Sequence, residues 1–364
     1  MTLEESTVYF GWIIGSYAFM QFLFSPIMGG LSDRYGRRPV LLFSLFGLGV
    51  DYLFMYFAPS LVWLVIGRCI SGMFGASFTT ASAYIADVSN KENKTKNFGM
   101  VGAAFGVGFV FGTAIGGLLG DFDPRSPFLV AAGLSLLNLI YGFFVLKESL
   151  PVSKRRPFSL KRSNPIGAIK QMRKYKALGG LFVVIFFYYL AGTAIHVSWV
   201  YYTAEKFSWS LSEVGVSLAI VGVCIAVVQG GLTGRFAKAY GDVKTAFIGL
   251  FIFVLALVGI SFATEGWMLY ALMIPYAFTG LASPAIKAIM SNNTIEEEQG
   301  ELQGSITSII SVAEIIGPLM MMWLFAYTTI DVAEESKFYG SPFLLGSVFV
   351  VIATVIFAVA TRKR

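Results

Sequence analysis

The chain has 364 residues, of which 56% are hydrophobic and only 13% are charged. A soluble globular protein carries about 25% charged residues, so this composition excludes a soluble enzyme, a nucleic-acid-binding module and a disordered chain. The net charge of +6 does not by itself indicate an acidic partner, because in a membrane protein the placement of basic residues matters more than their sum. Two cysteines within apolar runs and a single histidine predict neither a disulfide framework nor a metal site.

Eleven apolar runs are long enough to cross a bilayer as helices, which takes roughly 20 residues each. The runs are continuous rather than alternating, and this excludes a transmembrane β-barrel. The sequence therefore predicts an all-α integral membrane protein. The expected spans cover about 8–28, 39–58, 61–86, 98–120, 126–146, 178–203, 213–233, 243–263, 267–290, 303–326 and 342–361.

The basic residues predict the orientation of these spans. Of the 27 Lys and Arg residues, 22 fall on one side of the expected membrane, in 29–38, 87–97, 147–177, 234–244 and 362–364. Because cytoplasmic segments carry the excess of Lys and Arg, these segments and the C-terminus are expected in the cytoplasm. The predicted location is the cell membrane, which in a Gram-negative bacterium is the inner membrane.

The chain also resembles itself. Residues 29–35 (GGLSDRY) are echoed by residues 230–236 (GGLTGRF), and Gly112 and Gly317 lie in matching spans. Two halves in the same order and orientation form a parallel repeat, which is common in secondary transporters. The predicted domains are an N-terminal bundle of five spans at 1–146 and a C-terminal bundle of six spans at 178–364.

A basic linker at 147–177 joins the two bundles. Ile166, Ile169 and Met172 recur every three residues, a pattern that favours an amphipathic helix on the inner leaflet. A simple tether that fixes the topology is the alternative.

The first half is one helix shorter than the second. In the second half 52 residues separate the start of its first span from Gly230, whereas 28 residues precede Gly29. The difference of 24 residues is one membrane helix. We therefore expect a twelve-span architecture whose first helix is absent from this chain, with a natural eleven-span protein as the alternative.

A short cytoplasmic turn, residues 29–40 (GGLSDRYGRRPV), joins two spans. Its carboxylate and guanidinium groups can form charge-assisted bonds that break and remake. The string resembles the signature between helices 2 and 3 of the major facilitator superfamily. That resemblance implies a conformational switch on the cytoplasmic side, and its candidate residues are Gly29, Asp33, Arg34, Gly36, Arg37, Arg38 and, at the end of the span at 61–86, Asp87.

Further strings narrow the resemblance. Residues 66–72 (IGRCISG) are similar to the helix-4 arginine motif, and residues 265–267, 283–285 and 299–304 resemble the tetracycline-efflux subgroup of proton-coupled drug exporters. The resemblance implies two six-helix bundles, alternating access, and exchange of a small molecule for protons. It also implies a monomer in a lipid bilayer that needs no cofactor beyond the proton gradient and binds no nucleic acid.

This chain departs from the subgroup at three places. The helix-5 motif, residues 112–117 (GTAIGG), lacks the family's proline, and the family's helix-1 acid would lie in the absent segment. Ile225 and Phe253 stand where tetracycline pumps place a histidine and an aspartate. Transport of tetracycline itself therefore does not follow from the resemblance.

Ionisable residues inside the expected spans are functional candidates, because each costs roughly 2.5–3.5 kcal/mol on insertion scales. Asp51 and Arg68 lie at similar depth on consecutive spans, so an ion pair between them is expected, with either a structural or a proton-coupling role. Glu314 lies near mid-membrane, where a carboxyl group suits a proton carrier or a contact for a cationic substrate, with a hydrogen-bonded structural role as the alternative. Lys287, near an inner helix end, is expected to extend to the interface.

Five polar or aromatic residues are candidates for lining a substrate cavity. The alternative role is interhelical hydrogen bonding for the two glutamines, packing for the two tyrosines and a satisfied position at the outer interface for the histidine. The five are Gln21, Tyr188, Tyr189, His196 and Gln229.

The function predicted from these observations is proton-coupled efflux of a small amphipathic or drug-like molecule by alternating access. The alternatives are a major facilitator importer of a metabolite and a transport-inactive membrane scaffold. An enzyme is disfavoured, since the sequence has no recognisable nucleophile–base pair, metal cluster or nucleotide loop.

Overall fold

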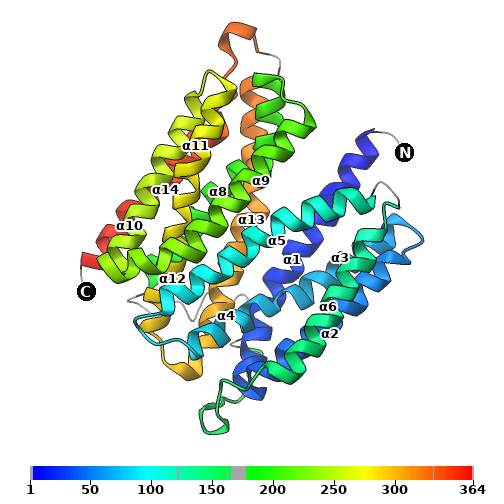
Figure 1. Ribbon diagram of the computed structural model, residues 1–364, viewed down its shortest axis with the longest axis vertical. Helices are drawn as coiled ribbons and strands as arrows, with labels where there is room; N and C mark the ends of the chain where they lie inside the picture. Colours follow the sequence, from blue (N-terminus) through cyan, green and yellow to red (C-terminus); the bar gives the residue numbers. More distant parts are fainter. Residues whose placement is uncertain (1–2, 121–122, 162, 165–177, 331, 363–364) are drawn as a thin grey trace. The chain divides into compact units, whose positions relative to one another are not determined.

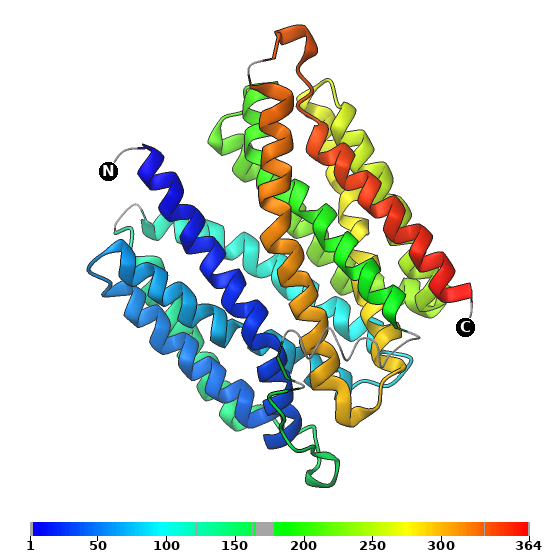
Figure 2. The same cartoon turned by 180° about the vertical axis from the view of Figure 1, so that it is seen from behind.

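The computed structural model describes residues 3–120, 123–161, 163–164, 178–330 and 332–362. Across these residues the regular elements are helices (Figures 1 and 2). The amphipathic helix expected around Ile166, Ile169 and Met172 lies outside the described residues.

The first half of the chain forms long helices joined by short turns. They are α1 (Leu3–Tyr35), α2 (Arg37–Tyr56), α3 (Leu61–Gly75), α4 (Ser77–Asp87), α5 (Lys94–Gly120) and α6 (Ser126–Val145), followed by the short helix η1 (Val152–Lys154). Serine and proline at 126–127 begin α6, as proline in the first turn of a helix favours.

The second half repeats this pattern of long helices, with short 3₁₀- or π-helical elements between several of them. Its elements are α8 (Gly179–Phe207), α9 (Leu211–Val227), η2 (Val228–Leu232), α10 (Thr233–Phe262), α11 (Gly266–Phe278), η3 (Thr279–Leu281), α12 (Ala282–Asn292), η4 (Glu296–Glu298), α13 (Gln299–Thr329), η5 (Glu334–Ser336) and α14 (Ser341–Arg362). The element η2 is a single π-helical turn, and such turns are frequent at functional sites.

Eight helical stretches of the described residues are long and apolar enough to cross a membrane. One of them, Ser212–Phe262, has 51 residues and covers two expected spans. The remaining expected spans near the N-terminus and at 98–120 lie on α1 and α5. The chain is thus a multi-pass helical membrane protein, and the count of eleven crossings stays a prediction.

The surface of α6 supports burial in lipid. Its Leu137 and Phe144 side chains are 63% and 79% exposed, and most of the helix faces away from the rest of the protein. An apolar helix that leaves large side chains uncovered would be unstable against water, so these residues are expected to contact lipid.

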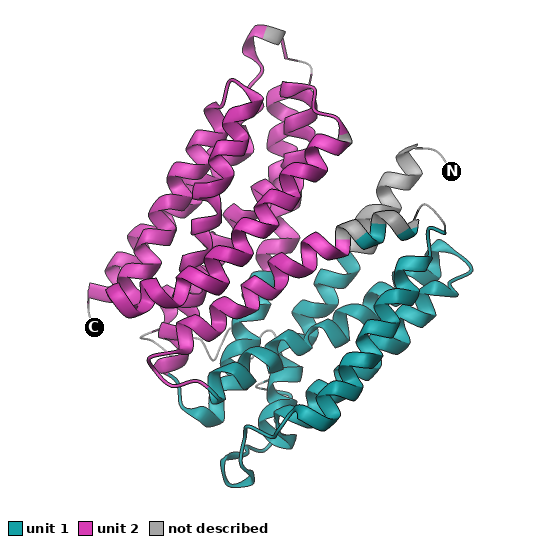
Figure 3. Cartoon of the chain, viewed as in Figure 1, with its two compact units in different colours: residues 1–88, 113–175, 294–311 teal, residues 89–112, 176–293, 312–364 magenta. Residues whose placement is uncertain are grey.

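The chain divides into two compact units (Figure 3). Unit 1 contains Met1–Val88, Thr113–Tyr175 and Thr294–Ser311, and unit 2 contains Ser89–Gly112, Lys176–Asn293 and Val312–Arg364. Each unit therefore includes the beginning of one helix from the other half of the sequence, α13 in unit 1 and α5 in unit 2. The domain boundaries at 146 and 178 stay a prediction.

Backbone geometry supports the repeat. Gly36, between α1 and α2, has φ 99° and ψ 162°, and Gly241, inside α10, has φ 76° and ψ 162°. The spacing of these two glycines is the same 205 residues that separates Gly112 from Gly317. Both conformations lie in the positive-φ region, which residues with a Cβ rarely adopt, so both turns favour glycine.

Candidate cytoplasmic switch site

Arg37 is the centre of a buried charge cluster in unit 1. It begins α2 directly after the Gly36 turn, and its side chain is fully buried. Arg37 Nη1 donates to Asp33 Oδ1 at 2.5 Å, and Arg37 Nε donates to Asp87 Oδ2 at 2.9 Å. The spacing of Asp33 and Arg37 by four residues puts them together across the turn, whereas Asp87 arrives from the end of α4. Three of the switch candidates thus lie in contact, and their switching role stays a prediction.

The carboxylate of Asp33 also binds the first turn of α13. Its Oδ1 accepts a hydrogen bond from the Gly300 amide and its Oδ2 from the Glu301 amide, both at 3.0 Å. Amides in the first turn of a helix have no partner within the helix and carry its positive dipole end, so an anion there is stabilised. We call Asp33, Arg37, Asp87 and these two amides the switch cluster.

The backbones of α1 and α13 come unusually close beside the switch cluster. A Cβ added to Gly29 would lie 2.3 Å from the Gly300 carbonyl oxygen, and one added to Gly300 would lie 2.5 Å from that of Gly29. Further along, a Cβ on Gly304 would lie 2.9 Å from Pro26 Cα, and Ser308 Oγ donates to the Phe22 carbonyl at 3.3 Å. The first part of α13 is therefore closely packed along α1.

The other two arginines of the turn lie outside the switch cluster. Arg34 is exposed, with its guanidinium over the Tyr35 ring at 5.0 Å. Arg38 donates from Nη2 to the Phe143 carbonyl at 2.7 Å and so contacts the end of α6. Sequence reasoning grouped both with the switch, because the motif alone does not show which face of the turn is buried.

Two polar atoms in the switch cluster are buried without a hydrogen-bond partner in the described part of the chain. They are Arg37 Nη2 and Asp87 Oδ1. A buried charge network that leaves such atoms unpaired is less stabilising than a fully paired one.

A related joint lies in unit 2, at the turn that echoes residues 29–35. A Cβ on Gly106 of α5 would lie 2.6 Å from the Gly222 carbonyl of α9, and one on Gly99 would lie 2.6 Å from the Gln229 carbonyl. Thr95 Oγ1 donates to Asp242 Oδ1 at 2.5 Å, a contact that sequence reasoning missed. The GGLTG turn of the second half thus holds the beginning of α5, as the GGLSD turn of the first half holds the beginning of α13.

Gln229 belongs to this joint. It lies in the π-helical turn η2, and a Cβ on Gly102 would lie 1.5 Å from its Oε1, while one on Gly280 would lie 2.5 Å from its Nε2. The amide is therefore wedged between α5 and η3. These contacts support its alternative role between helices.

Asp51 and Arg68 do not form the expected ion pair. Asp51 is buried and accepts a hydrogen bond from Ser71 Oγ, whereas Arg68 Nη2 lies 2.9 Å from Met55 Sδ. Ser71 lies one helical turn beyond Arg68 on α3. At that position its short side chain is close enough to donate to Asp51. The two charges form no salt bridge and act on each other only at longer range.

Glu314 is exposed in the middle of α13, although it lies far from either end of the helix. Lys287 of α12 is 7% exposed, and its Nζ lies 5.7 Å from the centre of the Tyr189 ring. The expectation that Lys287 extends to the interface is therefore wrong. The charge of Lys287 instead acts on the Glu314 carboxylate within unit 2.

The tyrosine candidates are held by packing contacts. Tyr188 Oη donates to the Thr279 carbonyl at 3.2 Å, and Tyr189 Oη shares a hydrogen bond with Ser283 Oγ at 3.1 Å. His196, on the same helix α8, is exposed, and Gln21 of α1 is half-buried. His196 and Gln21 therefore stay cavity predictions.

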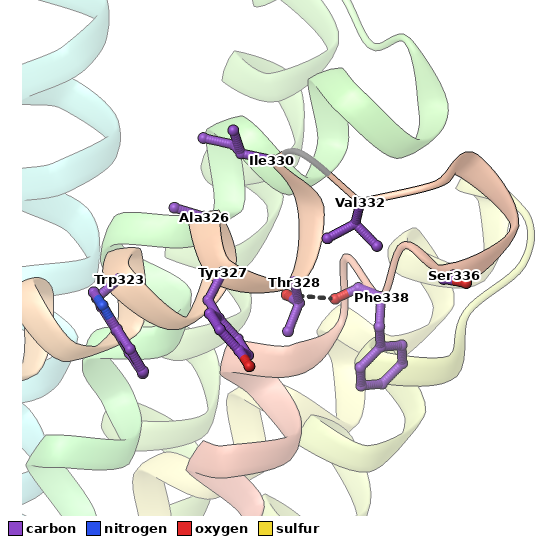
Figure 4. Close-up of a pocket in the computed structure, with 8 residues that line it drawn as sticks. All are labelled: Trp323, Ala326, Tyr327, Thr328, Ile330, Val332, Ser336 and Phe338. Atoms are coloured by element: carbon purple, nitrogen blue, oxygen red, sulfur yellow. Dashed lines mark hydrogen bonds between the residues drawn. The ribbon is translucent and has the colours of Figure 1, made fainter.

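A pocket of about 670 Å³ lies at the far end of α13 (Figure 4). Its wall includes Trp323 and Tyr327, whose rings stack 5.4 Å apart, and Phe338. The dashed line in Figure 4 joins Thr328 Oγ1 to the Phe338 carbonyl, a hydrogen bond of 3.1 Å. The candidate site residues predicted from the sequence are not among its lining residues.

Two long helical halves with matching turns, a buried charge cluster and apolar outer helices define a multi-pass membrane transporter. A family model described as Major Facilitator Superfamily matches residues 3–229 and, a second time, residues 181–364. The chain belongs to the major facilitator superfamily.

Several known proteins resemble the chain over most of its length. It is 38% identical to the tetracycline resistance protein, class C, of Escherichia coli over 93% of this chain and 84% of that protein. It is 33% identical to the class B protein of Escherichia coli over 89% of this chain and 81% of that protein. A human protein named hippocampus abundant transcript-like protein 1 is 27% identical over 94% of this chain and 71% of its own length.

Solved structures share the fold at lower identity. The human organic anion transporter MFSD10 (TETRAN) superposes with a TM-score of 0.85 at 22% identity, over 96% of this chain and 83% of that one. FucP, a major facilitator transporter solved in the outward conformation, superposes with a TM-score of 0.75 at 12% identity, over 99% of this chain and 91% of that one. Both of these proteins are described as transporters.

Proposed function

We propose that the protein exports a small amphipathic or drug-like molecule across the cell membrane in exchange for protons, by alternating access. The single observation that carries this proposal is the switch cluster, in which one buried arginine joins α1, α2 and α4 and one carboxylate joins them to α13. The similarity to tetracycline resistance proteins supports export as the direction.

Alternating access requires contacts that exist in one state and are absent in another. The switch cluster joins the cytoplasmic turn of the first half to the beginning of a helix from the second half. In the state described here the contact is closed. In the opposite state α13 would separate from α1. The two amides of its first turn would then donate to water instead of to Asp33.

Glu314 is the proposed proton carrier. It is an exposed carboxyl group in the middle of an apolar helix, where the charged form is costly unless water or a cation is near. Lys287 supplies a cation in the same unit, and its attraction offsets part of the cost of the charged form. Such a group can take up a proton on one side and release it on the other.

Transport in everted membrane vesicles tests the proposed function. Vesicles acidified inside by respiration and containing a pH-sensitive acridine dye would receive tetracycline, ethidium and a fluoroquinolone in turn. The proposal predicts proton release from the vesicles and uptake of at least one compound, both absent in vesicles without the protein. Two results would contradict export by proton exchange. One is release of a compound from the vesicles, which is the direction of import, and the other is the absence of proton-dependent flux with a broad panel of amphipathic drugs.

A further inference from the structure

The segment that follows α6 crosses the switch cluster, and we call its described residues, 148–161 and 163, the strap. It begins at the amino end of α2, where Glu148 Oε1 accepts from the Arg37 amide at 2.8 Å. The next residue, Ser149, donates from Oγ to Asp87 Oδ2 at 3.0 Å, and Leu150 is 1% exposed. A carboxylate at a helix amino end is favourable, so the start of the strap is anchored on the two helices that supply Arg37 and Asp87.

The strap then passes over the end of α1. The Arg156 amide donates to the Asp33 carbonyl at 3.0 Å. Ser163 is 5% exposed, and a Cβ on Gly30 would lie 2.1 Å from Ser163 Oγ. A flexible tether between two domains needs no such contacts, because its entropy favours keeping it free.

The side chain of Arg156 extends from the strap to α13 and the turn before it. Its Nη1 lies 3.3 Å from Glu298 Oε1 and 3.2 Å from Glu301 Oε2. These groups are partly buried, with side-chain exposures of 19%, 9% and 8%, so solvent screens them less than it screens a surface pair.

A second pair joins the same two segments at the surface. Lys154 pairs with Glu296, and that hydrogen bond raises the pKa of Lys154. Both side chains are well exposed, so the pair itself adds little stability. It does show that a basic run in the strap matches an acidic run, residues 296–298, that precedes α13.

We propose that the strap is a latch, with Arg156 as its fastening residue, that holds the beginning of α13 against α1 in the state described here. The beginning of α13 has one anchor in Asp33 and a second in Arg156. Both must release before α13 can leave α1. The latch rests on the proposed alternation of access, but its test below needs neither a substrate nor a proton gradient.

The test measures how readily a buried position on α13 becomes accessible. Ser305, 4% exposed and one helical turn beyond Glu301, is changed to cysteine in a protein whose Cys69 and Cys224 are replaced by serine. The rate of its reaction with N-ethylmaleimide is measured in membranes for the parent, for Arg156→Glu and for Lys161→Glu. Lys161 is an exposed cation of the same strap, which makes it the matched control.

The latch predicts that Arg156→Glu raises the reaction rate at least about fivefold, because hydrogen bonds to charged groups are lost and repulsion replaces them. Lys161→Glu should leave the rate within twofold of the parent. The reversed pair Arg156→Glu with Glu301→Arg should return the rate toward the parent value, which also shows that the single variant folds. Equal rates for the parent and Arg156→Glu, or an equal increase with Lys161→Glu, would overturn the latch. Faster labelling of Arg156→Glu in a protein whose parent transports none of the tested compounds would leave the latch standing and argue against the proposed function instead.

Discussion

Arg37 is the residue on which the switch cluster depends. Its guanidinium is fully buried between two carboxylates, so removing it would leave Asp33 and Asp87 without their shared cation. Breaking a buried ion pair from one side typically costs about 3–5 kcal/mol. The cluster is therefore expected to lose its closed arrangement while the helices remain inserted in the membrane.

We expect Arg37→Ala to reduce the initial rate of transport at least about tenfold, since a loss of 1.4 kcal/mol already changes a population ratio tenfold. Arg34→Ala is the matched control, because Arg34 lies in the same turn and is exposed. Transport and membrane content are measured together in the vesicle assay. Unchanged transport in the Arg37 variant would contradict the switching role.

Glu314 is a second residue with a specific expected behaviour. Glu314→Gln keeps the shape and hydrogen bonding of the side chain but removes its ability to ionise. Transport driven by a pH gradient should be lost, while substrate exchange without a gradient should be retained. Glu205→Gln, at the exposed end of α8, is the control. A variant at Glu314 that still accumulates substrate with the parent's pH dependence would show that this carboxyl group is structural.

At the scale of elements, two glycine contacts set the approach of α13 to α1. We expect Gly300→Ala to destabilise the closed state by about 1–3 kcal/mol, the usual cost of inserting a methyl group into a close-packed site. The added Cβ would lie 2.4 Å from Asp33 Oδ1 and 2.5 Å from the Gly29 carbonyl. A lower temperature of thermal unfolding in detergent checks the expectation.

Gly108→Ala on α5 is the control for this substitution. A Cβ there would have no neighbour within 4 Å in the described chain, so its unfolding temperature should equal that of the parent. If Gly300→Ala unfolds at the same temperature as Gly108→Ala, the close approach of α1 and α13 does not contribute to stability.

The element scale also shows how far sequence reasoning reaches. The helices follow from long apolar runs, and the meeting of Asp33 with Arg37 follows from a spacing of four residues around a glycine turn. The approach of α13 was not predictable, because it depends on two glycines 271 residues apart whose contact only the packed chain reveals. The pair expected between Asp51 and Arg68 failed for a related reason, since equal depth on two helices does not fix the rotation of either helix.

The linker was predictable as a basic segment but not as a strap. Its positive charge, which predicts a cytoplasmic side, fits a tether and a binding segment equally well. The difference lies in residues that look ordinary in the sequence, such as Leu150 and Ser163, which are buried in the folded chain. Burial of linker residues is a property of the folded molecule and has no local sequence signal.

At the scale of the whole molecule, the repeat gives each unit a joint of the same kind. Unit 1 holds the beginning of α13 with the GGLSD turn, and unit 2 holds the beginning of α5 with the GGLTG turn. The two joints differ in chemistry, because Asp33 of the first turn is replaced by Gly234 in the second. The charged joint, which also carries the strap, is the one expected to respond to protons and substrate.

The opening of that joint is the central claim, and the distance between spin labels measures it most directly. Labels are placed at Tyr35→Cys and Ile295→Cys, two exposed positions on either side of the switch cluster in unit 1, with Cys69 and Cys224 replaced by serine. Double electron–electron resonance, measured in lipid nanodiscs at neutral pH, should give a single short distance between the two labels in the parent protein. Arg37→Ala should add a second, longer population. A single unchanged distance in both proteins, at every pH and with every transported compound, would contradict an opening joint.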